Sequence, residues 1–135
     1  MKKSELGFTM IELIVVIVVL GILAATALPK FIDLNSDAKA AALKGVAGAS
    51  ASAMTINYSG CAVTQHVVTA SKCVKVSNCN VLGSLLLGGL PAGYTVAAAA
   101  LGAGTAGANG VEATCTLTQT DGSATATFTG VSAGV

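Results

Sequence analysis

The chain has 135 residues, of which 53% are hydrophobic and 10% are charged, and it contains no tryptophan. This length and composition suit one small domain attached to one apolar helix. Seven basic residues stand against six acidic ones. This balance excludes the basic surface with which proteins neutralise nucleic-acid phosphates.

The first predicted element is an apolar helix that follows a short basic leader. Residues 8–28 contain a single charged residue, Glu12, and provide about the 20 residues that a helix needs to cross a bilayer. Lys2 and Lys3 precede this run, so the positive-inside rule places them in the cytoplasm and the remainder outside. A carboxylate within the membrane is costly, and Glu12 therefore predicts a functional site with a partner.

The residues just before the helix suggest the partner of Glu12. Cleavage between Gly7 and Phe8 would free an amino group about one helical turn from Glu12. The two groups could pair within one helix. In a bundle of identical helices, the amine of one copy can equally meet the carboxylate of a neighbour, and this pairing would drive assembly.

The string Lys-Lys-Ser-Glu-Leu-Gly-Phe-Thr-Met-Ile-Glu-Leu-Ile-Val-Val-Ile resembles the class III leader and N-terminal helix of type IV pilins. Gly7 precedes an aromatic residue, and Glu12 is the fifth residue after the cut. The resemblance implies an α+β fold in which a long N-terminal helix packs against a small antiparallel β-sheet. It divides the chain into a cleaved leader (1–7), a transmembrane and filament-core helix (8–28) and a globular pilin domain (29–135).

The same resemblance implies how the chain is processed and used. A prepilin peptidase would cut after Gly7 at the bacterial inner membrane and methylate the amine of Phe8. An inner-membrane assembly platform and an assembly ATPase would then pack the mature subunits into an extracellular helical filament. Such a homo-oligomeric fibre serves adhesion, twitching motility or DNA uptake. Its subunit is not an enzyme and needs no cofactor.

Several alternatives remain open for the helix and for the function. A conventional secretory signal is one, because Ala25-Thr26-Ala27 offers a small-residue cleavage site. A pseudopilin of a type II secretion system shares the leader and the helix. A monomeric membrane-anchored binding domain would use the helix only as a tether. Cysteines late in the chain favour a pilin over a pseudopilin.

The helical pattern continues past the membrane segment to about Tyr58. Small and apolar residues recur at spacings of three and four, which predicts one continuous helix. Pro29 predicts a kink, and the resemblance implies that residues 21–29, from Gly21 to Pro29, lose helical structure in a filament. The predicted stripe is Phe31, Leu34, Ala38, Ala41, Ala42, Val46, Ala49, Ala53 and Ile56, and Gly45, Gly48, Ser50 and Ser52 are expected to allow close helix approach.

Four cysteines in a small exported domain predict two disulfides. Three connectivities are possible. We favour Cys61 with Cys73, which closes a local loop, and Cys79 with Cys115, which ties the C-terminal strands to the middle of the domain. The alternative is a zinc site, but the spacings are irregular and no CxxC occurs, so no metal is expected.

Short β-prone segments follow Gly60. Residues 60–80 are expected to form a surface loop with a short strand at 65–69. Asn78 or Asn80 is expected to cap a short helix over 81–87, whose leucines dock onto the sheet. Strands are predicted at 94–99, 111–119 and 124–128, with a hairpin turn at Asp121-Gly122; their threonines face one way, and Cys115, Leu117, Ala126 and Phe128 face the other.

No catalytic constellation is apparent. His66 is expected to be a surface histidine. Lys72 and Lys75 mark a small basic patch on the loop. Asn57-Tyr58-Ser59 fits a glycosylation sequon, although a helix end is the simpler interpretation. Residues 102–110, rich in Gly and Ala, are expected to form a mobile loop.

Overall fold

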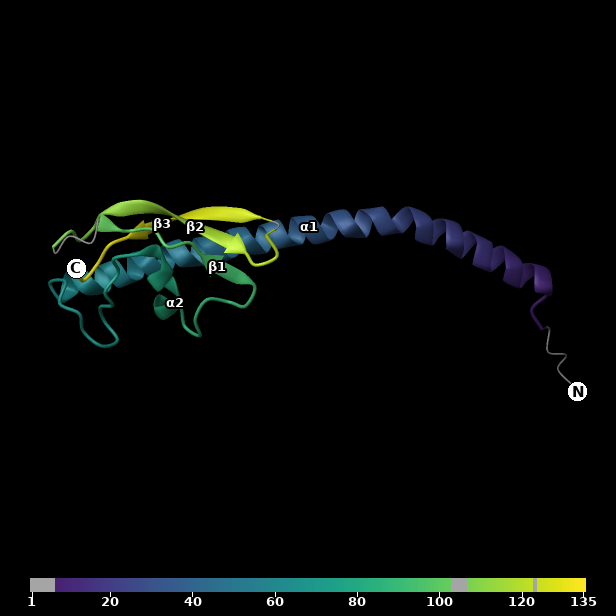
Figure 1. The fold of residues 1–135 in the computed structure, drawn as a ribbon. Helices are drawn as coiled ribbons and strands as arrows, with labels where there is room; N and C mark the ends of the chain where they lie inside the picture. The colour runs from purple at the N-terminus through teal and green to yellow at the C-terminus, as the bar shows by residue number, and fades with distance from the viewer. Residues whose placement is uncertain (1–6, 103–106, 123) are drawn as a thin grey trace, which may run out of the picture. The chain divides into compact units, whose positions relative to one another are not determined.

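A computed structural model describes residues 7–102, 107–122 and 124–135, without the side chains of residues 31–33. The chain divides into two compact units, Met1–Lys39 and Ala40–Val135. Helix α1, Met10–Val63, supplies residues to both (Figure 1). The units are therefore described one at a time. The expected loop at 102–110 lies partly outside the described residues, as do the leader and the side chain of Phe31.

In the N-terminal unit, the described residues form the first part of α1 and the three residues that precede it. The helix begins at Met10, two residues later than expected, and it continues through Pro29. The large apolar side chains that the structure describes in this part of the helix are exposed. A helix so long and so apolar meets the length and composition requirements for crossing a membrane. The predicted apolar helix is thus present.

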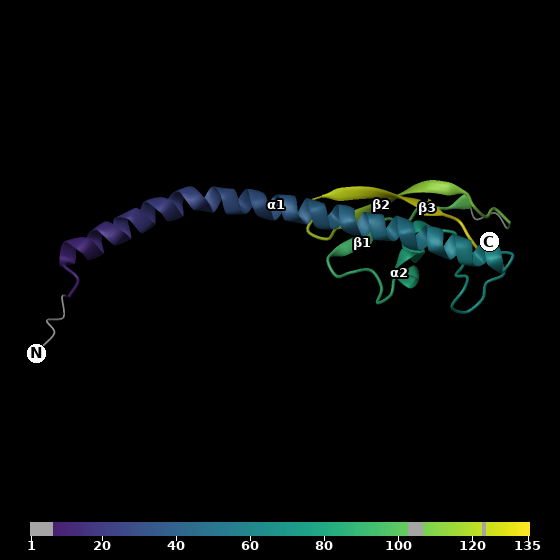
Figure 2. The ribbon, with the colours of Figure 1, turned by 180° about the vertical axis from the view of Figure 1, so that it is seen from behind.

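The C-terminal unit combines the rest of α1 with a small antiparallel sheet. The remaining elements are η1 (Cys79–Val81), α2 (Leu82–Leu85), β1 (Tyr94–Val96), β2 (Glu112–Gln119) and β3 (Thr125–Val131). The strands are ordered β1-β2-β3, and each neighbouring pair is antiparallel. Figure 2 shows the same unit from behind, where α1 passes in front of the sheet. This long helix on a small sheet confirms the expected α+β class.

The register of β2 and β3 confirms the predicted alternation of side chains. Thr114, Thr116 and Thr118 lie opposite Thr129, Thr127 and Thr125. Successive residues of a strand point to opposite faces. Cys115, Leu117 and Phe128 therefore point the other way, and all three are buried. The hairpin turn contains Gly122, whose φ is +70° and whose N–H donates to the carbonyl of Gln119.

The stripe of α1 that packs against the sheet differs from the predicted one. Its most buried positions recur at spacings of three and four, as a helix face requires. Ile56, which was expected on the stripe, is 71% exposed, while Ser50 is fully buried instead of available for helix approach. Alanine is so frequent here that it does not distinguish one face from another. The packed stripe is Leu43, Ala47, Ser50, Met54, Asn57 and Cys61.

The predicted end of the helix near Tyr58 is wrong, because α1 continues to Val63. The N–H of His66 donates to the carbonyl of Cys61, and that of Gln65 donates to the carbonyl of Ala62. Gln65 has a φ of +54°. These two bonds around a left-handed residue form a Schellman motif. Glycine usually occupies the left-handed position, and its absence there removed the sequence signal for the end.

The segment between α1 and the sheet also differs in detail. No strand forms at 65–69; Thr69 pairs only with Cys73, in an isolated bridge. The short helix is split into η1 and α2 and ends at Leu85 instead of Leu87. Asn78 does cap it, because its side chain accepts from the N–H of Asn80. Leu82 is fully buried in the core and Leu85 packs against it, as predicted.

Candidate functional site

The candidate site lies at the start of α1, where Gly7 and Phe8 precede the helix. The side chain of Phe8 is 90% exposed, and no atom of the described residues lies within 4 Å of the position that a Cβ on Gly7 would occupy. Both residues that flank this peptide bond are therefore exposed. A small residue followed by an exposed aromatic, outside any helix or strand, is accessible to a peptidase.

Thr9 and Glu12 form a reciprocal pair at the first turn of the helix. The Glu12 carboxylate oxygen Oε2 accepts from the main-chain N–H of Thr9 at 2.8 Å and from its hydroxyl at 2.7 Å. The Thr9 hydroxyl oxygen in turn accepts from the N–H of Glu12 at 3.3 Å. This is a capping box, in which the residue before the helix and the third helical residue satisfy each other's free N–H groups.

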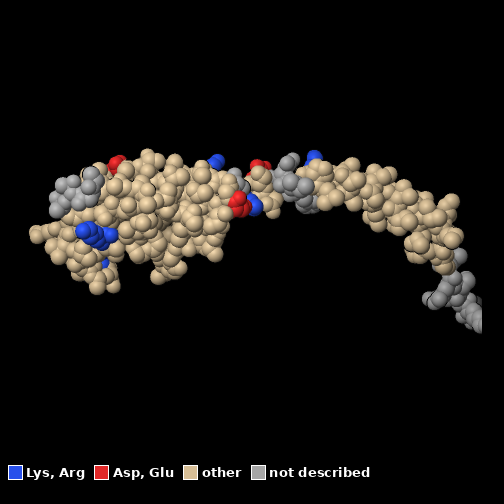
Figure 3. Space-filling view, viewed as in Figure 1, with Lys and Arg blue, Asp and Glu red and all other residues tan. Residues whose placement is uncertain are grey.

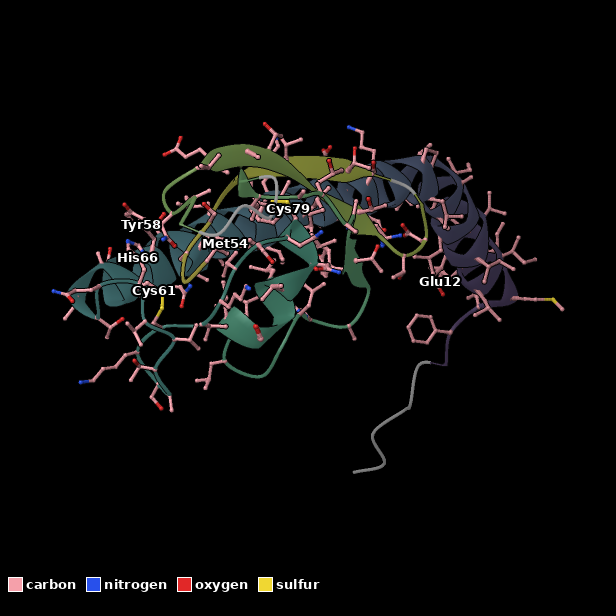
Figure 4. The ribbon with its side chains drawn as sticks, turned by 60° about the vertical axis from the view of Figure 1, so that its left-hand side comes forward. Glu12, Met54, Tyr58, Cys61, His66 and Cys79 are labelled. Carbon is pink, nitrogen blue, oxygen red and sulfur yellow. A yellow bond between two sulfur atoms is a disulfide. The ribbon has the colours of Figure 1, made fainter. Side chains whose placement is uncertain are left out.

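The two oxygens of Glu12 are used unequally. Both bonds from Thr9 end on Oε2, and no described donor reaches Oε1. A carboxylate can accept about four hydrogen bonds in all. Oε1 is therefore free to accept a donor from outside this helix while Oε2 holds the cap. Figure 4 shows Glu12 at the N-terminal end of α1.

Apolar side chains surround Glu12 and extend for several turns beyond it. Phe8, Ile11, Val15 and Val16 line a shallow hollow together with Glu12. The next charged residue along the chain is Lys30. Figure 3 shows no charged side chain on the visible face of the apolar first part of α1. An exposed apolar surface of this extent marks a contact with lipid or protein.

Gly21 and Pro29 lie inside the helical part of this unit. Pro29 cannot donate a main-chain hydrogen bond, yet α1 is assigned as helix on both sides of it. The position of a Cβ on Gly21 meets no described atom within 4 Å. Residues 21–29 are therefore helical in the isolated chain, and loss of helix there in a filament stays a prediction.

The structure joins Cys61 to Cys73 and Cys79 to Cys115, the two pairs favoured from the sequence. Their Cα atoms are 4.5 Å and 5.7 Å apart, and all four residues are buried. The first bond closes the loop that follows α1. The second joins the start of η1 to the middle of β2. Among the residues that the structure describes, no group of His, Cys, Asp or Glu could hold a metal ion.

His66 differs from the surface histidine expected at this position. It is half-buried, and its ring centre lies 5.4 Å from that of Tyr58. Its Nδ1 atom is buried without a hydrogen-bond partner among the described residues. Figure 4 shows His66 beside Tyr58 and Cys61 at the C-terminal end of α1. The histidine thus packs against the end of the helix and no catalytic partner accompanies it among the residues described.

Asn57 serves the fold and is not free to accept a sugar. It is 9% exposed. Its amide nitrogen donates to the carbonyl of Val74 at 2.8 Å, and its amide oxygen accepts from the N–H of Val74 at 2.9 Å. The Asn57 side chain thus forms the pair of hydrogen bonds with Val74 that the main chain of a neighbouring strand would form. By contrast, Lys72 and Lys75 are both exposed, as a solvated pair would be.

Thr9 is the functional residue that sequence reasoning missed. The signal was present, since a threonine followed three residues later by glutamate, just before an apolar run, is typical of a helix start. Among the described residues, Glu12 therefore has Thr9 as its partner, and no described donor reaches its Oε1.

The helix start and the fold define the class of this protein. A family model described as the prokaryotic N-terminal methylation motif matches residues 2–28. This match covers the leader, Glu12 and the apolar part of α1. The N-terminal segment of the chain is therefore similar to this methylation motif.

The chain is also similar to a particular pilus protein. It is 50% identical over 50 residues to the type IV narrow pilus major component PilA5 of Thermus thermophilus. The match covers 37% of this chain and 43% of that protein, so it spans less than half of the relative. No solved structure matches the chain. Together the two findings confirm the resemblance to type IV pilins, and they point to a structural family instead of an enzyme family.

Proposed function

We propose that the chain is the structural subunit of a type IV pilus. In this proposal it is cut between Gly7 and Phe8, methylated on the amine of Phe8 and polymerised through α1 into a surface filament. The observation that carries the proposal is the fully exposed apolar start of α1 with one carboxylate, Glu12, whose Oε1 has no described donor. Such a surface needs both an apolar cover and a cationic partner.

A neighbouring subunit supplies both requirements. Its apolar helix covers the exposed side chains, and its Phe8 amine donates to Glu12 Oε1. A hydrogen bond between two charged groups is short and strong. An unpaired charge in apolar surroundings is costly. Pairing therefore favours the arrangement in which each new subunit places its amine beside the carboxylate of an earlier one.

The partners and the location follow from this mechanism. The precursor waits in the bacterial inner membrane with α1 as its anchor. A prepilin peptidase, an inner-membrane platform and an assembly ATPase act on it, and the product is an extracellular homo-oligomer. The fibre serves adhesion, twitching motility or DNA uptake. The pilus role of the Thermus relative favours this function over that of a pseudopilin or of a monomeric anchored domain.

The experiment compares the wild type with Glu12→Gln and Gly7→Val. Sheared surface material is examined by electron microscopy, and the N-terminus of the subunit is determined by mass spectrometry. The wild type should form fibres whose subunit begins with methylated Phe8. Gly7→Val should stay a full-length membrane precursor. Glu12→Gln should be processed, because its cleavage site is intact, but should form few fibres, because a neutral amide cannot neutralise the amine.

Two results would contradict the proposal. A wild-type subunit that is processed but forms no fibre would favour a pseudopilin or a tethered domain. A mature protein that begins after Ala27 would indicate a conventional secretory signal. Normal fibres from Glu12→Gln would remove the charge pair from the mechanism while leaving the assignment as a pilin.

A further inference from the structure

The outer edge of β3 has main-chain groups without partners among the described residues. Two hydrogen bonds, one at each end of the β2·β3 hairpin, show which residues of β3 bond to β2. Gln119 N–H donates to the carbonyl of Ala124, and Ser132 N–H donates to the carbonyl of Val111. Hydrogen-bonded pairs alternate with non-hydrogen-bonded pairs along an antiparallel ladder. Even-numbered residues of β3 therefore bond to β2. The N–H and C=O groups of Thr125, Thr127 and Thr129 point away from β2, and no described residue bonds to them.

This edge lacks the features with which proteins usually protect an edge strand. Natural edges carry charged residues or prolines, are very short, or are covered by another segment. β3 has seven residues, and no charged residue or proline occurs from Gly122 to the end of the sequence. Thr125, Thr127 and Thr129 are all exposed. The opposite edge differs, because β1 has only three residues and Ala100 beyond it pairs with Asn78.

We propose that the β3 edge pairs with the same edge of a second copy of this chain. In an antiparallel arrangement centred on Thr127, that residue faces Thr127 of the second copy, and Thr125 faces Thr129. All three facing pairs are then of the hydrogen-bonded type. About six main-chain hydrogen bonds would form, and the two three-stranded sheets would become one continuous sheet.

The side chains favour this occupant and this register. The edge is neutral, so two copies meet without like charges opposite each other, which would be unfavourable. On the exposed face of the joined sheet, threonine meets threonine, a favourable cross-strand pair. On the other face, Ala126 meets Phe128 of the second copy. A shift by one residue would set the outward-pointing main-chain groups of one copy opposite inward-pointing groups of the other, and the hydrogen bonds of the ladder could not form.

The symmetry of the contact defines what it does. A twofold contact uses the same surface on both copies, so it closes at two and cannot propagate a filament. Growth of the fibre stays with α1, and the β3 edge links one fibre to another. This consequence for fibres rests on the proposed function, whereas the pairing of two copies does not.

The pairing is tested with full-length protein in detergent by mild oxidation. In Thr127→Cys the two introduced residues would lie about 5.5 Å apart at their Cα atoms, within the range of a disulfide. Thr116 lies directly opposite Thr127 on β2 and serves as the matched control. Two copies of Thr116→Cys would be separated by three strand spacings, about 14 Å, too far for a bond.

A covalent dimer of Thr127→Cys, mapped by mass spectrometry to the introduced cysteines, supports the proposal if Thr116→Cys gives none. No dimer from Thr127→Cys, equal dimers from both variants, or a bond to another protein overturns it. The native disulfides are checked in the same peptide map. A dimer that forms through exchange with Cys115 therefore counts against the proposal.

A second set of variants blocks the edge without breaking the sheet. Thr127→Pro removes only an outward N–H, a position where an edge strand tolerates proline, and Thr127→Lys adds a charge. Both should lose the dimer, measured by light scattering, while Thr116→Lys should keep it. Dimers unaffected by Thr127→Lys overturn the proposal.

Micrographs of the same variants distinguish the two proposals. Single fibres from Thr127→Lys, where the wild type forms bundles, support a link between fibres. Bundles unchanged by that variant overturn this link and leave the pilin assignment intact. A wild type without fibres contradicts the proposed function, and the dimer experiment in detergent still decides the pairing of the edges.

Discussion

Thr9 holds one carboxylate oxygen of Glu12 through two hydrogen bonds, of 2.8 Å from its N–H and 2.7 Å from its hydroxyl. This relationship gives Glu12 a role within its own helix besides the proposed pairing with a neighbour. The cap directs Oε2 toward Thr9. It thereby fixes where Oε1 lies for an amine that arrives from another subunit.

The first prediction concerns the hydroxyl of Thr9. Thr9→Val has nearly the same shape but its side chain cannot donate to Glu12, so the cap should weaken by about 1 kcal/mol. Processing should continue, and fibre yield should fall below the wild type but stay above that of Glu12→Gln. Thr9→Ser keeps the hydroxyl and should assemble normally. The yield is measured as the amount of pilus protein sheared from the cell surface. Equal yields from Thr9→Val and Thr9→Ser would show that the cap does not position the Glu12 carboxylate.

The second prediction concerns Asn57 and its two bonds to Val74. Asn57→Ala leaves a partly buried N–H and a partly buried C=O of Val74 without the Asn57 bonds, at a cost of about 2 to 4 kcal/mol for the two. Thr55→Ala, which removes an exposed hydroxyl two residues earlier, should change stability by less than about 0.5 kcal/mol. Denaturant unfolding of residues 30–135 gives both values. Equal midpoints for the two variants would contradict a structural role for Asn57.

The third prediction compares the two disulfides. They span 12 and 36 residues, and the chain-entropy model gives about 3 kcal/mol for the shorter loop and about 4 kcal/mol for the longer. The Cys79→Ser and Cys115→Ser double variant should therefore unfold at lower denaturant than the Cys61→Ser and Cys73→Ser variant. The reverse order would indicate that the loop after α1 matters more to stability than the link between η1 and β2.

The fourth prediction contrasts two glycines of α1. A Cβ on Gly60 would collide with the main-chain oxygen of Lys72, whereas a Cβ on Gly48 meets nothing within 4 Å. Gly60→Ala should thus cost about 1 to 3 kcal/mol through overpacking. Gly48→Ala should gain about 0.5 to 1 kcal/mol from helix propensity. Thermal unfolding of residues 30–135 tests whether each substitution raises or lowers the unfolding midpoint. A Gly60→Ala variant that is more stable than the wild type would show that the loop at Lys72 moves aside without cost.

The fifth prediction concerns the left-handed residue that ends α1. Gln65 has a φ of +54°, a conformation that costs a residue with a side chain about 1 kcal/mol. Gln65→Gly should remove this cost and raise the unfolding midpoint. Thr64→Gly, one position earlier, provides the control and should destabilise, since it removes the hydrogen bonds of the Thr64 hydroxyl to the carbonyls of Cys61 and Val67 and adds entropy loss. Destabilisation by Gln65→Gly would show that its side chain makes a compensating contact.

Sequence patterns alone predicted the elements whose signals are local. The apolar run with Glu12, the alternating threonines of β2 and β3 and the turn at Gly122 each depend on neighbouring residues, because periodicity is a property of a short segment. The class III leader is likewise a contiguous string. These features determined the α+β class and the resemblance to pilins.

Tertiary structure decided which side of α1 is buried, where the helix ends and what Asn57 does. Alanine occupies every face of the outer helix, so only packing against Leu117 and Phe128 of the sheet selects the stripe that contains Leu43 and Met54. The helix passes Gly60, where the main chain of Lys72 lies close to it, and ends only at the motif around Gln65. The buried face of α1, its end and the role of Asn57 each depend on residues that are distant in the sequence. A local sequence pattern does not contain this information, because packing between distant segments forms cooperatively.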